Sequence, residues 1–483
     1  MNSRIARHRT ALTRNQLSRP VSIALEAGVL TSERTFFDYG CGRGSDLAIL
    51  ASLGVTASGW DPAFFADNER RAADVVNLGY VVNVIEDKRE RVDALRGAWT
   101  LARKVLCVSA RLFGEEKELR GAPYQDGIVT SARTFQKLFL QEELRDWIRS
   151  ALDMEPIAAA PGVFFIFRDP TEGQGLLAAR FHRRLAIPSI EVSTALVEHY
   201  HEVLEPLIDF VTSRGRLPAP EELDAAPAIR STLGSIHRAF AVVKRVTGAS
   251  VWDRVRRLRG QDLLVYLALG RFRGRPRFGT LPAELQRDIR AIFGSYEKAC
   301  RLADSLLKRV GRPGEIEHAC AASEIGKLTP TALYIHDSAV SRLHPVLRVY
   351  EGCARVLFGL VNDAMIVKLH RREPKVSYLS YPEFDVEAHP ALRQSYLVDL
   401  RELDVVARDY RPQANPPILH RKETFVATDY PRFETFARLT RQEEREGLFD
   451  ETSSIGTRDG WEETLRLRRL SLRGHRLLRL GSL

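Results

Sequence analysis

Cysteines are scarce in this chain of 483 residues, and long apolar runs are absent from it. The five cysteines, at positions 41, 107, 300, 320 and 353, form no C-x-x-C pair and follow no regular spacing. They indicate reduced thiols instead of a disulfide framework or a zinc site. No apolar run approaches the roughly 18 residues of a membrane helix, and the basic N-terminus lacks the apolar centre of a signal peptide. We therefore expect a cytoplasmic protein with no membrane contact and no bound metal.

The overall composition is that of an ordinary soluble protein, with 44% hydrophobic and 28% charged residues. A chain of this length is too long for one hydrophobic core, so two or three domains are expected. Its net charge of +10 favours a polyanionic partner. We expect that partner to be DNA.

The most informative segment is 35–46, TFFDYGCGRGSD. Its apolar start predicts a buried strand that ends near Asp38, and its end predicts a helix that begins at Ser45 or Asp46. Between them stand Gly40, Gly42 and Gly44. Glycine tolerates positive φ and lets a ligand lie against bare backbone, so the segment predicts a ligand-binding turn between a strand and a helix.

A second acidic residue, Asp61, follows the β-rich segment 55–60. In a doubly wound sheet, an acidic residue at the end of the second strand accepts hydrogen bonds from ribose hydroxyls. Residues 73–86 indicate another strand running into a helix, provisionally the fourth strand, and 158–168 indicate a closing hairpin strand. This alternation of strands and helices favours a parallel α/β sheet.

The layout resembles the first motif of the class I S-adenosylmethionine-dependent methyltransferases, an acidic residue followed by x-G-x-G-x-G. That resemblance implies a Rossmann-like α/β domain with S-adenosylmethionine as its cofactor. The cofactor-binding residues that it implies are Asp38, Gly40, Gly42, Gly44, Asp61 and Asn77. Another Rossmann-like domain that binds a different nucleotide is the alternative, because nicotinamide and flavin folds also use a glycine turn.

Two alignments of this chain with known methyl-acceptor motifs, here called registrations, are open. Residues 77–80, NLGY, resemble the D/N-P-P-Y/F motif of base-amine methyltransferases without its two prolines. In this registration Asn77 accepts a hydrogen bond from the amine, Tyr80 stacks on a flipped base, and both are catalytic. In the other, residues 80–87 resemble a segment of methyltransferases for small molecules or RNA, and Asn83 or Glu86 borders the pocket.

We expect four regions along the chain: an N-terminal capping helix at 1–30, the cofactor-binding domain at 31–170, a basic helical domain at 171–310 and a mixed α+β domain with a basic tail at 311–483. The arginines at 4, 7, 9 and 14 have phosphate binding as an alternative use. Before the last strands, residues 134–148 predict a helix whose apolar positions belong to the core.

Within the basic helical region, residues 207–223 suggest a helix, a tight turn and a second helix. Plain helical packing is the main interpretation, and a DNA-binding helix-turn-helix is the alternative. Trp252, Tyr266, Phe272 and Phe278 lie among the arginines at 254–259 and 271–277, a mixture that suits a nucleic-acid surface.

The last region contains β-like segments at 367–372 and 396–400 and a segment at 420–423, HRKE, that indicates an exposed loop. The tail after Glu463 carries six arginines and no acid. It predicts a short solvated helix or, alternatively, an arm that neutralises phosphates.

Segments along nearly the whole chain resemble one bacterial family, the DNA phosphorothioation-associated methyltransferases. The segments that carry this resemblance are 7–12, 17–20, 37–44, 58–62, 76–87, 127–130, 134–137, 329–337 and 415–425. The family implies a link to systems that replace a backbone phosphate oxygen of DNA with sulfur for defence, and phosphorothioation-system proteins as partners. It supports Asp38, Gly40, Gly42 and Asp61 as cofactor contacts and names no catalytic residue.

We therefore predict an S-adenosylmethionine-dependent methyltransferase that acts on or binds DNA. One rival is an RNA methyltransferase with the same pocket, which label transfer to RNA but not to DNA would favour. The other is a non-catalytic DNA-binding subunit of a defence complex, whose signature is salt-dependent DNA binding without cofactor affinity.

Overall fold

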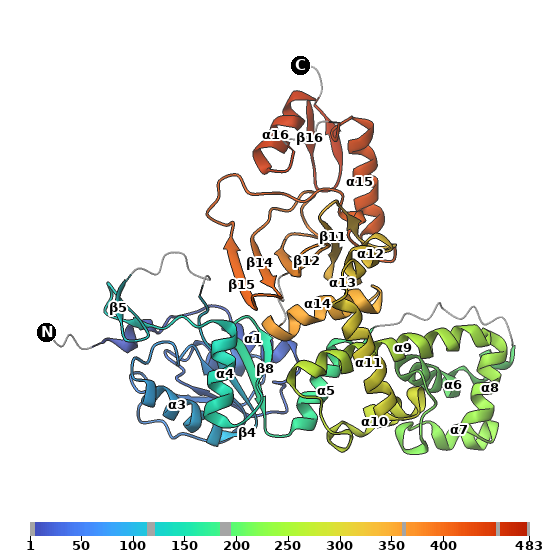
Figure 1. The fold of residues 1–483 in the computed structure, drawn as a ribbon, viewed down its shortest axis with the longest axis horizontal. Helices are drawn as coiled ribbons and strands as arrows, with labels where there is room; N and C mark the ends of the chain where they lie inside the picture. Colours follow the sequence, from blue (N-terminus) through green and yellow to red (C-terminus); the bar gives the residue numbers. More distant parts are fainter. Residues whose placement is uncertain (1–4, 114–120, 184–194, 360–363, 451–454, 481–483) are drawn as a thin grey trace. The chain divides into compact units, whose positions relative to one another are not determined.

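The computed structural model describes residues 5–113, 121–183, 195–359, 364–450 and 455–480. Contact clustering divides the chain into two units. The first comprises Met1–Asp169, Ile316–Val340 and Cys353–Leu483, and the second comprises Pro170–Glu315 and Ser341–Gly352. Figure 1 shows the course of the chain through them, and each is described by itself.

The N-terminal part of the first unit is built on a six-stranded sheet with the order β2-β1-β3-β4-β9-β8. Strands β1 to β4 run parallel, and β9 is antiparallel to both β4 and β8. The strands are β1 (Phe36–Tyr39), β2 (Ala57–Trp60), β3 (Ala73–Gly79), β4 (Ala102–Ser109), β8 (Ile157–Ala160) and β9 (Val163–Phe167). The helices are α1 (Arg19–Glu26), α2 (Ser45–Ser52), α3 (Lys88–Leu101) and α4 (Gln141–Leu152). This is a Rossmann-like α/β fold, as predicted.

The topology places β3 beside β1, on the side opposite β2. The chain leaves β2 and reaches β3 through 61–72, a connection without a helix. The strand at 73–79, which the sequence placed provisionally as the fourth, is the third strand of the chain and lies next to the first. Because consecutive strands leave β1 in opposite directions, the carboxyl end of β1 is a topological switch point, where open α/β sheets bind their ligands.

The predicted helix at 134–148 is wrong in its first half. Residues Phe135–Gln136 form the short strand β7, which pairs with β6 (Gly127–Thr130), and β6 pairs with β5 (Gly121–Tyr124). The helix α4 begins only at Gln141. Phe135 and Phe139 are buried as predicted, but pairing with a neighbouring strand, which the helical spacing does not reveal, holds Phe135 in extended backbone.

The C-terminal part of the first unit contains a second six-stranded sheet, antiparallel throughout, in the order β10 to β15. Its strands are β10 (Lys327–Leu328), β11 (Ala332–His336), β12 (Ala364–His370), β13 (Lys375–Ser380), β14 (Gln394–Asp399) and β15 (Asp404–Asp409). The helices of this stretch are α12 (Glu315–Ala321), α13 (Asp337–Val340), α15 (Phe433–Arg445), α16 (Arg458–Leu467) and the end of α14 (Pro345–Phe358), whose residues up to Gly352 belong to the second unit. The predicted β-like segments lie in β12 and β14.

Two predictions for the C-terminal part are wrong. The tail after Glu463 is not one helix, because α16 ends at Leu467 and a hairpin of β16 (Leu470–Leu472) and β17 (Leu477–Arg479) follows. The segment at 420–423 is not an exposed loop either. Lys422 is only 2% exposed, and its Nζ donates hydrogen bonds to the carbonyls of Phe384 and Glu387 at 2.6 and 2.5 Å. Tertiary packing around the aliphatic stem of this lysine overrides its local hydrophilicity.

The second unit is helical. Its helices are α5 (Pro170–Arg180), α6 (Ala195–Arg214), α7 (Ala226–Leu233), α8 (Ile236–Thr247), α9 (Ala249–Leu269), α10 (Ala283–Phe293) and α11 (Tyr296–Val310). The helix-turn-helix alternative at 207–223 is wrong, because only a short 3-10 turn, Pro220–Glu222, follows α6 there. Arg216 lies between α6 and this turn. Its side chain is buried and forms ion pairs with Glu222 and Asp288.

The aromatic residues of this unit do not form the nucleic-acid surface that the sequence suggested. Trp252 and Tyr266 are each only 4% exposed. Trp252 packs edge-on against Phe240, and the Tyr266 hydroxyl donates a hydrogen bond to Gln174. Phe278 packs against Tyr296, which leaves Phe272 as the exposed member of the four. The arginines and the aromatic residues therefore serve different surfaces.

Candidate cofactor and substrate site

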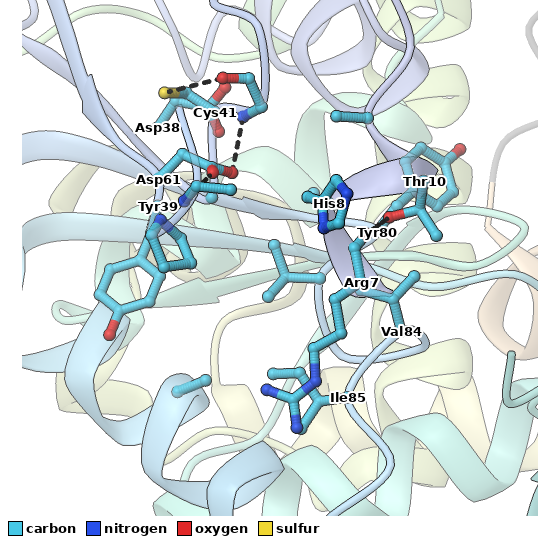
Figure 2. Close-up of a pocket in the computed structure, with 18 of the residues that line it drawn as sticks. Arg7, His8, Thr10, Asp38, Tyr39, Cys41, Asp61, Tyr80, Val84 and Ile85 are labelled. Carbon is cyan, nitrogen blue, oxygen red and sulfur yellow. Dashed lines mark hydrogen bonds between the residues drawn. The ribbon is translucent and has the colours of Figure 1, made fainter. Parts of the chain in front are cut away.

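A cavity of about 1370 Å³ opens at the carboxyl ends of β1, β2 and β3. It is lined by the glycine turn after β1, the segment after β2, the segment after β3 and the N-terminal residues before α1. Figure 2 shows Asp38, Cys41 and Asp61 gathered on one side of the view and Thr10 and Tyr80 on the other. The cavity thus lies at the switch point of the sheet, where the topology predicts a ligand.

The glycine turn has the backbone that the sequence predicted. Gly40, Gly42 and Gly44 have φ values of 91°, 54° and 75°. A Cβ on Gly40 would collide with the Val81 side chain, and a Cβ on Gly42 would lie 3.2 Å from the Cβ of Ala11. Side chains at these two positions would therefore fill the cavity floor, and glycine keeps the backbone accessible to a ligand.

Asp61 lies directly after β2 and binds the glycine turn. Its Oδ2 accepts a hydrogen bond from the Gly42 amide at 3.0 Å, and its Oδ1 accepts from the amides of Ala63 and Phe64 at 2.8 and 3.1 Å. An ionised carboxylate offers about four acceptor positions. The backbone amides thus fix the orientation of Asp61. The carboxylate can still accept a further hydrogen bond from a ligand hydroxyl in the cavity.

Asp38 and Asn77 form a buried pair beneath the turn. They lie side by side on β1 and β3, and the Asn77 Nδ2 donates to the Asp38 Oδ1 at 2.9 Å. Burial raises the pKa of Asp38 to about 7, and the nearby carboxylates of Asp46 and Asp61 add to the shift. The Asn77 Oδ1 is buried without a hydrogen-bond partner. Because an unsatisfied buried oxygen is costly, this atom marks a position for a donor from a ligand.

The residues of both acceptor registrations line the same cavity. Tyr80 follows β3 with a left-handed φ of 59°, and its backbone amide donates to the carbonyl of Ser109 at 3.0 Å. Asn83 is buried, its Nδ2 donates to Gln136 at 3.1 Å, and its Oδ1 has no partner. Glu86 also lines the cavity. The structure therefore brings Asn77, Tyr80, Asn83 and Glu86 together and does not choose between the two registrations.

An N-terminal strap, residues 5–18, covers part of the cavity. Arg7 forms ion pairs with Glu86 at 2.8 Å and with Glu90 at 2.5 Å. The amide of Ser18 donates to Asp46 at 2.7 Å, and the amide of Arg14 donates to the Ser45 hydroxyl at 3.1 Å. The strap is thus held at both ends, beside α3 and at the start of α2.

The predicted N-terminal helix is present as α1 (Arg19–Glu26), and it begins later in the chain than expected. Except for a short 3-10 turn at Arg7–Thr10, the segment that lines the cavity is irregular, and helix α1 begins only at Arg19. The Arg7 guanidinium serves an ion pair with Glu90, which raises the pKa of Arg7, instead of a free phosphate site. Arg4 lies outside the described residues.

Sequence reasoning missed His8 and Arg111, which also line the cavity. His8 lies in the segment 7–12 that carries part of the family resemblance, but the resemblance gives it no role, and the packing of the strap brings it to the cavity. Cys41 lies in the turn, but burial and the carboxylates of Asp38 and Asp61 raise the pKa of its thiol to about 12. It therefore stays protonated at neutral pH and is not a nucleophile.

No protein-family model and no curated protein sequence matches the chain. Solved structures show weak likeness. One is CalS10, an amino pentose methyltransferase from Micromonospora echinaspora with bound SAM, at 17% identity over 31% of this chain and 89% of that chain, with a TM-score of 0.23. Another is an O-methyltransferase family protein from Burkholderia thailandensis, at 16% identity over 30% and 55%, with a TM-score of 0.22.

A third is magnesium protoporphyrin IX methyltransferase from Synechocystis PCC 6803 with bound SAH, at 14% identity over 34% of this chain and 93% of that chain, with a TM-score of 0.23. TM-scores this low do not assign a function, so the assignment of the pocket rests on its own geometry. Among the described residues, no helix combines the length and the apolar character needed to cross a membrane. Nor does any group of three or more His, Cys, Asp or Glu in that part of the chain have an arrangement that suits a metal ion.

Proposed function

We propose that the N-terminal domain is an S-adenosylmethionine-dependent methyltransferase. The observation that carries the proposal is the accessible glycine turn after β1, which is bound to Asp61 after β2 and opens into a large cavity at the switch point. Bare backbone suits an amino-acid moiety and a carboxylate after the second strand suits the two hydroxyls of a ribose, and S-adenosylmethionine carries both groups.

The residues present fit this cofactor. Gly40 and Gly42 leave open backbone where side chains would fill the floor, and Asp61 has acceptor capacity to spare. The orphaned Asn77 Oδ1 offers a further acceptor. When bound, S-adenosylmethionine supplies an electrophilic methyl group on a sulfonium.

The protein's part in the reaction is to orient the methyl acceptor and to exclude water. In the proposed mechanism, the Asn77 Oδ1 would accept a hydrogen bond from the acceptor amine and hold its nitrogen lone pair toward the methyl donor. The N–CH₃ bond would form as the S–CH₃ bond breaks, and the amine proton would leave to solvent. Asp38 fixes the orientation of the Asn77 amide through the 2.9 Å hydrogen bond. Tyr80 lies at the end of β3 as a stacking surface, and the N-terminal strap closes the cavity from solvent.

The acceptor that we propose is a base amine of DNA, in a system linked to DNA phosphorothioation. What supports it is the presence of Asn77 and Tyr80 in one cavity, the basic net charge of +10 and the segment resemblance to the phosphorothioation-associated family. An amine acceptor suits side-chain oxygens, and Asn77 and Asn83, which both line the cavity, each have a buried Oδ1 without a hydrogen-bond partner.

The experiment is transfer of a labelled methyl group from S-adenosylmethionine to DNA and to RNA by the wild-type protein and by Asn77→Ala and Asn83→Ala. We expect label on DNA, and we expect Asn77→Ala to lower turnover at least about 100-fold, since a lost positioning contact in the transition state costs a few kcal/mol. Asn83→Ala is the matched control for an orphaned amide in the same cavity. Loss with Asn83→Ala alone would assign the other registration, and label on RNA alone would refute DNA as the acceptor.

A further inference from the structure

The basic charge of the chain is concentrated in its helical unit. Residues 170–315 and 341–352 contain 26 lysines and arginines against 17 aspartates and glutamates, a net charge of +9. The rest of the chain therefore contributes only +1 of the total of +10. Within the unit, residues 225–252 contain no acid. These residues form α7, α8 and the start of α9.

Helices α7 and α8 form a helix-turn-helix. Only Gly234 and Ser235 separate the two, and Gly234 takes the positive φ of 80° that ends α7. The Ser235 hydroxyl caps α8 by accepting a hydrogen bond from the amide of Arg238 at 3.2 Å. Figure 1 shows the two helices next to each other at one end of the unit. A tight, capped turn of this kind holds the second helix at a fixed angle to the first.

The packing of α8 leaves one face free. Its buried side chains, Ile236, Ala239, Phe240 and Val243, join a core with residues of α6, α7 and α9. Arg238 and Arg245 stand on the opposite face, two turns or about 10 Å apart along the axis. Lys244 lies on the flank of the helix, about 100° around the axis from Arg245, with its Nζ 5.5 Å from the centre of the Phe240 ring. All three side chains are exposed, so the solvent side of α8 presents three cations and no carboxylate.

The cations of this surface have no acidic partner. Arg238, Lys244 and Arg245 form no ion pair with another described residue, and neither do three further exposed arginines on α7 and at the start of α9, Arg230, Arg254 and Arg257. Elsewhere in the same unit, Arg214, Arg216 and Arg287 are all paired with carboxylates. Other exposed cations of the unit, such as Arg277 and Arg301, also form no ion pair with a described residue. What distinguishes this surface is therefore the acid-free stretch 225–252.

Two acidic residues of the neighbouring helix α6 point away from this surface. Leu204, Leu207 and Val211 of α6 pack into the shared core. Glu202 and Asp209 are exposed and, at 100° per residue, project from the opposite side of that helix. On α9 the exposed Asp253 lies beside Arg254 and one turn before Arg257, whereas α7 and α8 contain no acid. The cations of α7 and α8 therefore repel one another, and a polyanion is the partner that removes the repulsion.

We propose that α8 is a DNA-binding helix that enters the major groove, with α7 and the start of α9 beside it on the phosphate backbone. The major groove of B-form DNA admits an α-helix, whereas the deep and narrow major groove of A-form RNA does not. The proposal names the partner of the methyltransferase and in that respect rests on the proposed function. Its test requires no methyl transfer.

The experiment measures binding of a fluorescent DNA duplex to the full chain across a salt series, without cofactor. The variant is Arg238→Ala/Lys244→Ala/Arg245→Ala. We expect at least about tenfold weaker binding and a salt dependence whose slope, log K against log salt, falls by about 3, since each phosphate contact contributes about 0.9. The charge-matched control is Arg89→Ala/Arg103→Ala/Arg401→Ala, which removes three exposed arginines of the other unit outside the basic tail and should change the affinity less than threefold.

Equal weakening by the two triple variants would overturn the proposal, because net charge alone would then explain the attraction. Tighter binding of an RNA duplex of the same sequence would overturn it as well. A second variant, Arg238→Lys/Arg245→Lys, keeps the charge and is expected to retain the salt slope. Titration of S-adenosylmethionine into the triple variant separates the two proposals, since the cofactor site belongs to the other unit.

Discussion

Two regions of the chain bury ionisable side chains, and they use them differently. In the N-terminal domain, Asp38 and Asn77 lie under a glycine turn and face a cavity in which the Asn77 Oδ1 is orphaned. In the C-terminal part, Lys422 is bound to two carbonyls and to the Nε2 of His475 at 2.9 Å, and His389 is bound to Glu443 at 2.7 Å. Unpartnered buried atoms occur in both regions, since the Glu443 Oε2 and the His420 Nδ1 also lack a hydrogen-bond partner. Asn77 differs from them because it lines the cavity, which points to a ligand, whereas Lys422 with its bound carbonyls acts as a structural tie.

The buried groups of the two regions respond to pH in different ways. Burial raises the pKa of Asp38 to about 7, so its contribution to stability is present below about pH 4 and is lost as the pH rises toward 7. Burial lowers the pKa of His389 and of His420 to about 3. Their contribution is present above about pH 6.5 and is lost as the pH falls toward 3. In the same cluster burial raises the pKa of Glu443 to about 8, so its contribution is lost as the pH rises from about 4.5 toward 8. Acid therefore weakens the contribution of the two histidines, whereas it favours Asp38 and Glu443.

The largest effect is expected from Lys422→Ala. The substitution leaves the carbonyls of Phe384 and Glu387 without their donor and opens a hole against Phe436, so it should lower the free energy of unfolding by about 3–5 kcal/mol. Urea unfolding followed by tryptophan fluorescence measures the loss. The control is Lys298→Ala, an exposed lysine that should cost less than about 0.5 kcal/mol. Equal stability of the two variants would show that the hydrogen bonds of Lys422 do not stabilise the fold.

The next effect has the opposite sign. Asp38→Asn removes a carboxyl group that is costly to ionise, so at pH 8 it should raise the free energy of unfolding by up to about 4 kcal/mol. At pH 4 the variant and the wild type should unfold alike. Thermal unfolding at the two pH values measures the difference. A variant less stable than the wild type at pH 8 would contradict the burial of an isolated acid at this position.

Segments whose structure depends on adjacent residues could be predicted from the sequence, and segments whose structure depends on distant partners could not. The strand, glycine turn and helix at 36–52 and the position of Asp61 were predicted, because strand ends and glycine turns are specified by adjacent residues. The strap was not, since Arg7 meets its partners Glu86 and Glu90 at a separation of about 80 residues. Likewise, the hydrophilic segment at 420–423 is buried only because other elements supply its hydrogen-bond partners.

The smallest effect is expected at the strap. The ion pairs of Arg7 with Glu86 and Glu90 are partly exposed, so Arg7→Ala should weaken closure over the cavity by about 0.5–1 kcal/mol. Stopped-flow measurement of cofactor release should show a two- to fivefold faster rate, with a smaller difference in high salt. Arg9→Ala, whose side chain meets only the carbonyl of Ala132, is the control. Identical release rates for both variants would mean that the strap does not act as a cover.

The most direct test of the account is a calorimetric titration of S-adenosylmethionine into the pure protein and into Asp61→Ala, with the exposed Asp67→Ala as a matched control. We expect micromolar binding by the wild type and by Asp67→Ala. Binding by Asp61→Ala should be at least about 100-fold weaker, since two hydrogen bonds to a charged group contribute about 3 kcal/mol together. Absence of binding in the wild type, or equal binding by all three proteins, would contradict the assignment of the pocket.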